Sequence, residues 1–141
     1  MSNSVPNYVR AEALEVAPVG SRVTCTPAPM DTDEDFLVLL PERGASTVLG
    51  LLIDDGYVID GSAITDGVNR RPLEEIFQSY SRRHVNLIVT RNRTFFQRFM
   101  AATDIAKRFN IMQKTDRIAL FQAVLYGNRC DPPPLMDIYQ E

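Results

Sequence analysis

The segment from Met30 to Leu40 constrains the fold more than any other part of the chain. Every position of its second half is apolar, and Pro41 closes the run Phe36-Leu37-Val38-Leu39-Leu40. A strand with one solvated face alternates apolar and polar residues, so an uninterrupted apolar run predicts a strand that is covered on both faces. We therefore expect the central strand of a sheet here.

The chain has 141 residues, of which 45% are hydrophobic, enough for one compact core but not for two ordinary domains. We expect a single domain over residues 1–131. A tail over residues 132–141, which opens with three prolines, is expected on the surface or against a partner subunit. No apolar run approaches the roughly 18–20 residues of a membrane span, and the polar start lacks the apolar centre of a signal peptide. The sequence thus predicts a cytosolic protein.

Charge and rare residues exclude several classes of function. The net charge of -3 does not provide the basic field that sequence-independent duplex binding usually needs, although a local basic groove stays open. Cys25 and Cys130 have no CxxC or Cys/His cluster around them, so they are read as reduced thiols. The single histidine, His84, cannot form a two-histidine metal site, and we expect it in a surface loop.

Periodicity predicts strands followed by helices, which is an α+β fold. Helices are expected over Pro6 to about Leu14, Arg43 to about Ile53, the stretch of phenylalanines from Phe95 to Phe109, and from Thr115 to a stop at Gly127-Asn128. Extended segments are expected at Val16 to Val23, interrupted by Gly20, at Tyr57–Ile59, and at Ile76–Tyr80 and Val85–Thr90, joined into a hairpin by Ser81–His84. The phenylalanines recur at helical spacing and are expected in the core, with the two last helices packed on one side of a small sheet.

Three aspartates precede the apolar strand at alternate positions: Asp31, Asp33 and Asp35. Alternation along a strand places side chains on one side, where carboxylates repel each other unless they are solvated or bind a cation. Ligands that are all oxygen favour Mg²⁺ or Mn²⁺ over zinc. Two such ions can activate a hydroxyl and neutralise a leaving pyrophosphate. The alternative reading is a solvated acidic turn.

The pair Gly20-Ser21, followed after a linker by Asp33-Glu34-Asp35-Phe36, resembles the motif of the polymerase-β-like nucleotidyltransferase superfamily. The resemblance implies a small mixed sheet of the nucleotidyltransferase type. It implies that Gly20 and Ser21 contact nucleotide phosphates, and that Asp33 and Asp35 are catalytic and hold Mg²⁺ or Mn²⁺. The residue types agree with this, because glycine lets the backbone approach closely and a hydroxyl beside backbone N–H groups suits a phosphate.

The sequence departs from the family pattern at Glu34, where an apolar residue is usual, so a register with Asp31 and Asp33 as the acid pair stays open. We prefer Asp33 and Asp35 because the apolar strand follows at once.

The second departure concerns the third acid, which the family supplies from a later strand. The best candidate strand, Val85–Thr90, carries Asn86 at the corresponding position. Asparagine can ligate weakly but cannot act as a base. Three other acids, Asp54, Asp55 and Asp60, could replace it if the fold placed them nearby.

The expected function is transfer of a nucleoside monophosphate from a nucleoside triphosphate to an unidentified hydroxyl acceptor on a small molecule, protein or RNA end. The alternative is a catalytically weakened domain that binds a nucleotide or a protein partner, and a third reading is a structural protein that matches the motif by chance. Homo- or hetero-oligomers are expected by analogy only. The arginines near the motif and hairpin are expected to be exposed and solvated: Arg22, Arg82, Arg83, Arg91 and Arg93.

Overall fold

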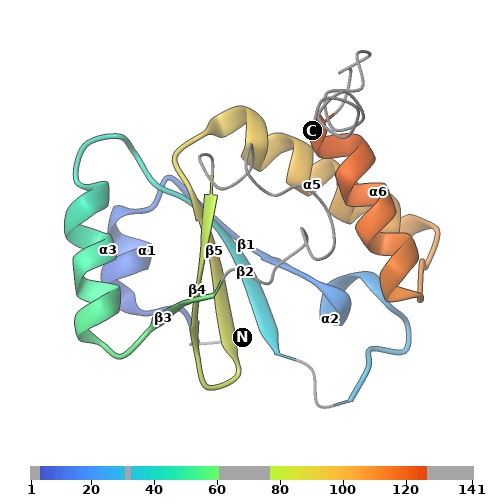
Figure 1. Cartoon of the computed structure of the whole chain (residues 1–141), viewed down its shortest axis with the longest axis horizontal. Helices are drawn as coiled ribbons and strands as arrows, with labels where there is room; N and C mark the ends of the chain where they lie inside the picture. The colour runs from blue at the N-terminus through green and yellow to red at the C-terminus, as the bar shows by residue number, and fades with distance from the viewer. Residues whose placement is uncertain (1–3, 31–32, 61–76, 127–141) are drawn as a thin grey trace, which may run out of the picture.

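The computed structural model describes residues 4–30, 33–60 and 77–126 and contains one five-stranded mixed sheet (Figure 1). The strands lie in the order β1-β2-β5-β4-β3. Only the neighbours β2 and β5 run parallel, and the other pairs are antiparallel. The bounds are β1 Glu15–Val19, β2 Glu34–Leu39, β3 Val58–Asp60, β4 Phe77–Arg82 and β5 Val85–Thr90.

Strand β2 is buried on both faces, as its apolar run predicts. Phe36 and Val38 pack into one core cluster, whereas Leu37 and Leu39 pack into a second cluster on the opposite face. The expectation of a central strand was wrong in one respect, since β2 is second in the order and β5 occupies the middle. Burial on two faces identifies an interior strand, but it does not distinguish one interior strand from another.

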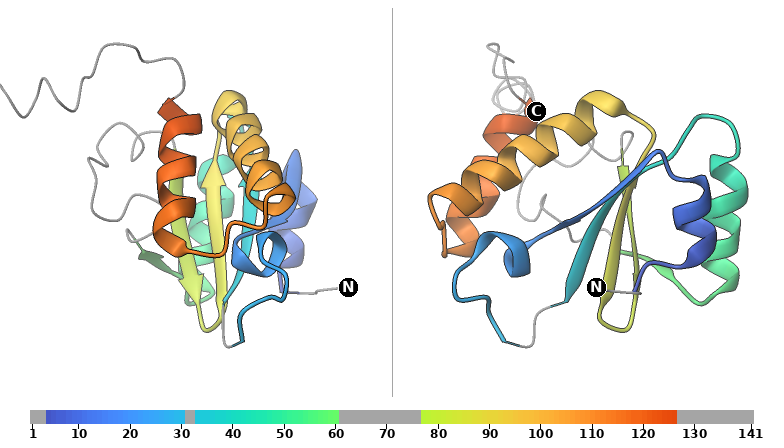
Figure 2. Two further views of the ribbon diagram at one scale, coloured as in Figure 1. Left: turned by 90° about the vertical axis from the view of Figure 1, so that its right-hand side faces the viewer. Right: turned by 180° about the vertical axis from the view of Figure 1, so that it is seen from behind.

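Helices cover both faces of the sheet (Figures 1 and 2). Helices α1 (Asn7–Glu12) and α3 (Ala45–Asp54) lie on one side. The short helix α2 (Ser21–Thr24) and the pair α5 (Arg93–Arg108) and α6 (Lys114–Tyr126) lie on the other. The predicted α+β class, with a C-terminal helical pair packed on one side of a small mixed sheet, is confirmed.

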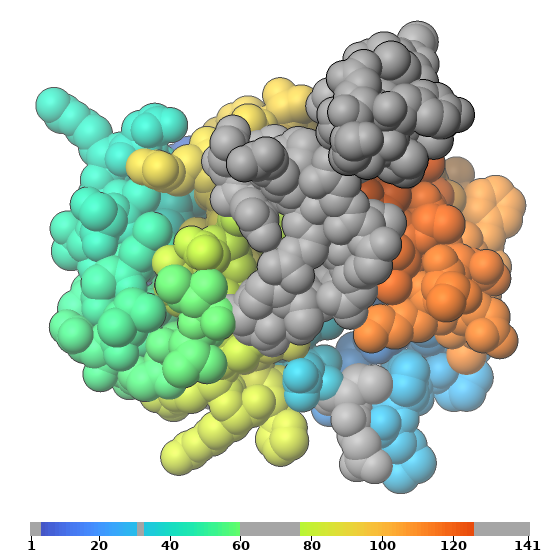
Figure 3. All heavy atoms as spheres, in the orientation of Figure 1, coloured from blue at the N-terminus to red at the C-terminus, as the bar shows by residue number. Residues whose placement is uncertain are grey.

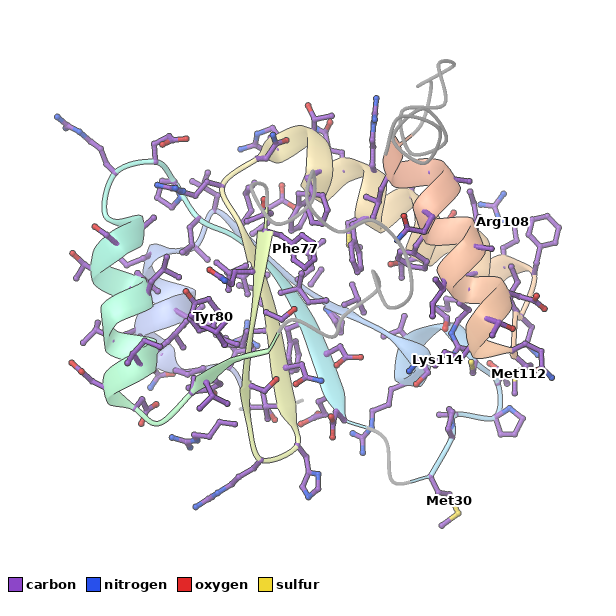
Figure 4. The ribbon with its side chains drawn as sticks, in the orientation of Figure 1. Met30, Phe77, Tyr80, Arg108, Met112 and Lys114 are labelled. Carbon is purple, nitrogen blue, oxygen red and sulfur yellow. The ribbon has the colours of Figure 1, made fainter. Side chains whose placement is uncertain are left out.

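Alternation along β4 divides its side chains between the two cores. Tyr80 lies in the cluster beneath α1 and α3, and Phe77 lies against the cluster beneath α5 (Figure 4). The ring of Phe77 stacks on Phe95 of α5 at a centroid distance of 5.1 Å. Leu37 of β2 and Ile88 of β5 belong to the same cluster, so they also face α5. Asp35 and Asn86 precede them by two residues and therefore lie on the same face of the sheet.

Several local predictions need correction. Val23 is helical, because Gly20 ends β1 at a φ of +85° and α2 begins at the next residue. The hairpin turn is shorter than expected, since β4 extends to Arg82 and only two residues join it to β5. Phe109 follows the last residue of α5 and is 69% exposed, so it does not belong to the core.

Other predictions fall partly outside the described residues, including the tail over 132–141, Gly127-Asn128 and Cys130. Cys25 is a buried free thiol, in agreement with its reading as a reduced cysteine. Among the helices of the described ranges, none has both the length and the apolarity that a bilayer crossing requires.

Candidate functional site

The acidic motif and the Gly-Ser turn meet at the start of β2. Asp35 pairs with Val19 on one side, the last residue of β1, and with Asn86 of β5 on the other. Gly20 and Ser21 follow Val19 directly, so the turn lies beside the Asp35 side chain. The structure thus brings Gly20 to Asp35, links Asp35 to Asp33 through Asn86, and places Ser21 directly after Gly20 as the first residue of α2.

Gly20 is in close contact with the carboxylate of Asp35. Its φ of +85° and ψ of -175° belong to a region that only glycine adopts readily. A Cβ atom at this position would lie 2.1 Å from Oδ2 of Asp35. Glycine is therefore required both by the backbone conformation and by the space that the carboxylate occupies.

Asn86 links the two acids. Its Nδ2 donates to Oδ1 of Asp35 at 2.9 Å and to Oδ2 of Asp33 at 3.2 Å. Its Oδ1 accepts a hydrogen bond from the hydroxyl of Ser81, its cross-strand neighbour on β4. The strand predicted to carry the third acid does lie beside Asp35, and an amide occupies that position.

The electrostatics of Asp35 favour a positive partner. Burial is the largest influence and raises the pKa of its carboxyl group, and the charge of Asp33 adds to the rise. The hydrogen bond from Asn86 and the guanidinium of Arg22 oppose it. Since burial disfavours the charged form, a cation at this carboxylate would relieve a cost that the fold imposes.

Arg22 forms an ion pair with Glu34, with Nη1 at 3.7 Å from Oε2, and its charge lowers the pKa of the neighbouring Asp35. Together with Arg10, it lines a hollow of about 290 Å³ that Asp35 and Glu34 also line. Val19 and Arg22, the residues on either side of the Gly-Ser turn, line this hollow, whereas Gly20, Ser21 and Asp33 do not.

His84 at the hairpin turn was missed by sequence reasoning as a neighbour of the site. Its side chain is 89% exposed, as expected of a surface residue, but Nδ1 lies 3.5 Å from Oδ1 of Asp33. The backbone N–H of Glu34 donates to the carbonyl of His84 at 2.8 Å, which fixes the turn against the start of β2. The turn projects from the lower edge of the molecule in Figure 3. The proximity of His84 to Asp33 follows from the pairing of β2 with β5, in which Glu34 lies opposite Val85.

The other acids considered as replacements are not brought to this site. Asp54 and Asp55 lie at the end of α3, on the opposite face of the sheet. Asp55 accepts hydrogen bonds from the hydroxyl of Tyr8 and from Nη1 of Arg82, both at 2.9 Å. The backbone of Asp60 pairs with Ser79 on β4, and its side chain, like the whole of Asp31, falls outside the described residues.

The two carboxylates fit a hard divalent cation, because they supply oxygen atoms, which Mg²⁺ and Mn²⁺ prefer. Asn86 directs Nδ2 toward both carboxylates, and its Oδ1 faces Ser81. Within the part of the chain that the structure describes, no group of three or more His, Cys, Asp or Glu side chains is arranged so that it could hold a metal ion. The site therefore has two acids and one amide at the positions where the resemblance implies three acids.

The arginines singled out in the sequence have exposed or partly exposed side chains. Their ion pairs are Arg22 with Glu34 at 3.7 Å, Arg82 with Asp55 at 2.9 Å, Arg91 with Glu42 at 3.9 Å and Arg93 with Glu15 at 3.5 Å. Arg83 is exposed at the hairpin turn, where its φ is +57°. Exposed pairs of this kind contribute little to stability.

Comparison with known proteins supports the fold. No family model and no curated protein matches the sequence. Among solved structures, the chain is similar to the conserved protein GrpB from Enterococcus faecalis, with a TM-score of 0.50 and 18% sequence identity over 93% of this chain and 78% of GrpB. The likeness shows that the chain shares the fold of GrpB, and at this identity it carries nothing about activity.

Proposed function

We propose that the chain is a nucleotidyltransferase that moves a nucleoside monophosphate from a nucleoside triphosphate to a hydroxyl acceptor, with Mg²⁺ or Mn²⁺ as cofactor. One observation carries the proposal: Gly20 packs so closely on Asp35 that a Cβ atom would lie 2.1 Å from the carboxylate. This packing supports the proposal, because a turn suited to phosphates would then lie directly beside a half-buried acid suited to a cation.

In the proposed site Asp33 and Asp35 are the catalytic residues that would hold the cation. A bound divalent cation would supply neutralisation of the phosphate charges and polarisation of the phosphorus centre. Gly20 allows the turn to pack against Asp35, and Ser21, the next residue, would offer its hydroxyl and N–H group to the triphosphate. Arg22, at the hollow beside the turn, adds a positive charge toward the leaving pyrophosphate.

A second candidate is a domain of the same fold that binds a nucleotide or a protein partner without transfer. Asn86 favours it, because an amide stands beside Asp35 where the resemblance implies an acid. An amide cannot take the proton of an attacking hydroxyl, so the enzyme would have to obtain its base from elsewhere.

Thermal unfolding with ligands tests binding. A nonhydrolysable nucleoside triphosphate with Mn²⁺ should raise the melting temperature of the full chain, because ligand that binds only the native state stabilises it. The shift should disappear in Asp35→Asn. It should persist in Asp54→Asn, which removes the same charge from the opposite face of the sheet.

Transfer is tested separately with α-phosphate-labelled nucleoside triphosphates and a panel of sugar, protein and RNA hydroxyl acceptors. Release of pyrophosphate with labelling of an acceptor supports the enzyme. Binding without transfer supports the second candidate, and neither binding nor transfer would contradict both. The nature of the acceptor, oligomer formation, and a cytosolic location remain predictions of the sequence.

A further inference from the structure

The orientation of the Asn86 carboxamide is unsuited to holding a cation, because its nitrogen and not its oxygen faces the two acids. Both of its short contacts with Asp33 and Asp35 are made by Nδ2. The hydrogens of an amide nitrogen carry positive charge and cannot ligate a metal, whereas the amide oxygen can. A cation held by the two carboxylates would therefore face repelling N–H groups unless the amide turned over.

Ser81 is the partner that could serve both orientations of this amide. Its hydroxyl now donates to Oδ1 of Asn86. A hydroxyl is also an acceptor and needs only to rotate its hydrogen, so it can receive a hydrogen bond from Nδ2 after a turn. Ser81 and Asn86 are opposite each other in the β4–β5 register, and the backbone pairing keeps them in reach throughout.

We propose that Ser81 is a positioning residue that allows the Asn86 carboxamide to turn over when a divalent cation binds at Asp33 and Asp35. After the turn, Oδ1 faces the cation and Nδ2 donates to the hydroxyl of Ser81. The inference rests on the proposed function, because it needs a cation at the acid pair. It adds a residue on β4 to a site that the sequence motif confines to the Gly-Ser turn and β2.

This rotation of the carboxamide explains how an asparagine can stand at this position in a site that binds a cation. Before the cation enters, two donated hydrogen bonds hold the like-charged carboxylates together. When it enters, those bonds are exchanged for one oxygen ligand, and the amide stays fully hydrogen-bonded only if position 81 can accept. Cation affinity should therefore depend on the hydroxyl at position 81.

Nuclear magnetic resonance of the isotope-labelled full chain observes the rotation of the Asn86 carboxamide directly. Without Mg²⁺, the side-chain amide protons of Asn86 should show cross-peaks to the β protons of Asp35. With saturating Mg²⁺, these should be replaced by cross-peaks to the β protons of Ser81. Mg²⁺ binding, seen as shifted carboxyl signals of Asp33 and Asp35, with unchanged Asn86 cross-peaks would overturn this inference and leave the proposed function standing.

Two variants test the role of the hydroxyl. Ser81→Val removes it and Ser81→Thr keeps it, with nearly the same shape and equal suitability for a strand. Mn²⁺ affinity, measured by electron paramagnetic resonance, should fall by about threefold to tenfold in Ser81→Val, the worth of one hydrogen bond, and stay within about twofold in Ser81→Thr. Equal affinities of the two variants would contradict the role of Ser81. If the wild-type chain shows no Mn²⁺ binding at all, the inference and the metal-dependent function fail together.

Discussion

Gly20 is the residue at which the site is most sensitive to a single methyl group. Gly20→Ala places a Cβ atom in the carboxylate of Asp35 and forces alanine into a conformation that glycine alone favours. We expect a loss of about 1–3 kcal/mol in the free energy of unfolding, together with loss of nucleotide binding. Urea denaturation and nucleotide titration measure the two effects.

Gly44→Ala is the matched control for that experiment. Gly44 has the same φ of +85°, but among the described residues a Cβ atom there would meet only Oε1 of Glu12, at 3.8 Å. It should lower stability without changing nucleotide binding, because Gly44 precedes α3 on the opposite face. If Gly20→Ala binds a nucleoside triphosphate as well as the wild type, Gly20 does not form a phosphate turn.

Asn86 is the residue that separates the two proposed functions. Asn86→Asp adds a third carboxylate next to Asp35 and supplies a potential base, so Mn²⁺ affinity should rise and transfer should increase by about 10²–10⁴-fold. Stability without a cation should fall, because two hydrogen bonds are lost and a like charge is added.

The control for Asn86→Asp is Gln78→Glu, which adds the same charge on an exposed position of β4. Rescue of a wild-type protein that shows no transfer would favour the binding domain. Unchanged or lower transfer in Asn86→Asp, measured against a readily detected wild-type rate, would mean that Asn86 is not the replaced third acid and that the base comes from elsewhere.

At the scale of elements, α5 supports the sheet face that carries the site. Phe99 of α5 is 2% exposed and its ring meets Phe121 of α6 edge-on at 4.9 Å. Phe99→Ala should lower the free energy of unfolding by about 3–5 kcal/mol, the usual cost of an aromatic cavity. Phe109→Ala, at a side chain that is 69% exposed, should change it by less than about 0.5 kcal/mol. Chemical denaturation of both variants tests this division; similar losses would contradict it.

Local patterns predicted most of the elements, but they missed α2 and the order of the strands. Hydrophobic period and turn residues indicated α3, β2 and the β4–β5 hairpin, because these signals are carried by adjacent residues. The contact of Asn86 with Ser81 was missed because the hairpin turn has two residues rather than the four expected. The central place of β5 depends on which strands pair and in which order. That choice is made by tertiary packing. The exposure of Phe109 was missed for a related reason, since helical spacing does not show where a helix ends.

At the scale of the whole molecule, the sheet is enclosed on both faces while the acid pair stays at one end of it. The clusters beneath α1 and α3 and beneath α5 and α6 hold β2 and β5 rigidly side by side. Asp35 belongs to this frame and is largely withdrawn from water, which is why its charge costs stability. The fold thus carries a site that is strained electrostatically but fixed in geometry, an arrangement suited to binding a cation without rearrangement of the backbone.

This cost makes the stability of the whole chain depend on pH. Because burial raises the pKa of Asp35, the folded chain holds its proton more tightly than the unfolded chain, whose value is near 3.8. Lowering the pH from neutral through the raised pKa toward 3.8 should therefore stabilise the wild type relative to Asp35→Asn, which has no proton to gain. Near neutral pH the variant should melt at a higher temperature than the wild type, since asparagine removes a half-buried charge that repels Asp33. The gap between their melting temperatures should narrow as the solution is acidified.

Saturating Mg²⁺ at neutral pH should also narrow the gap between the melting temperatures of the wild type and Asp35→Asn, by stabilising only the wild type. A gap that stays constant between pH 7 and the neighbourhood of 3.8 would show that Asp35 is not the strained acid of this site.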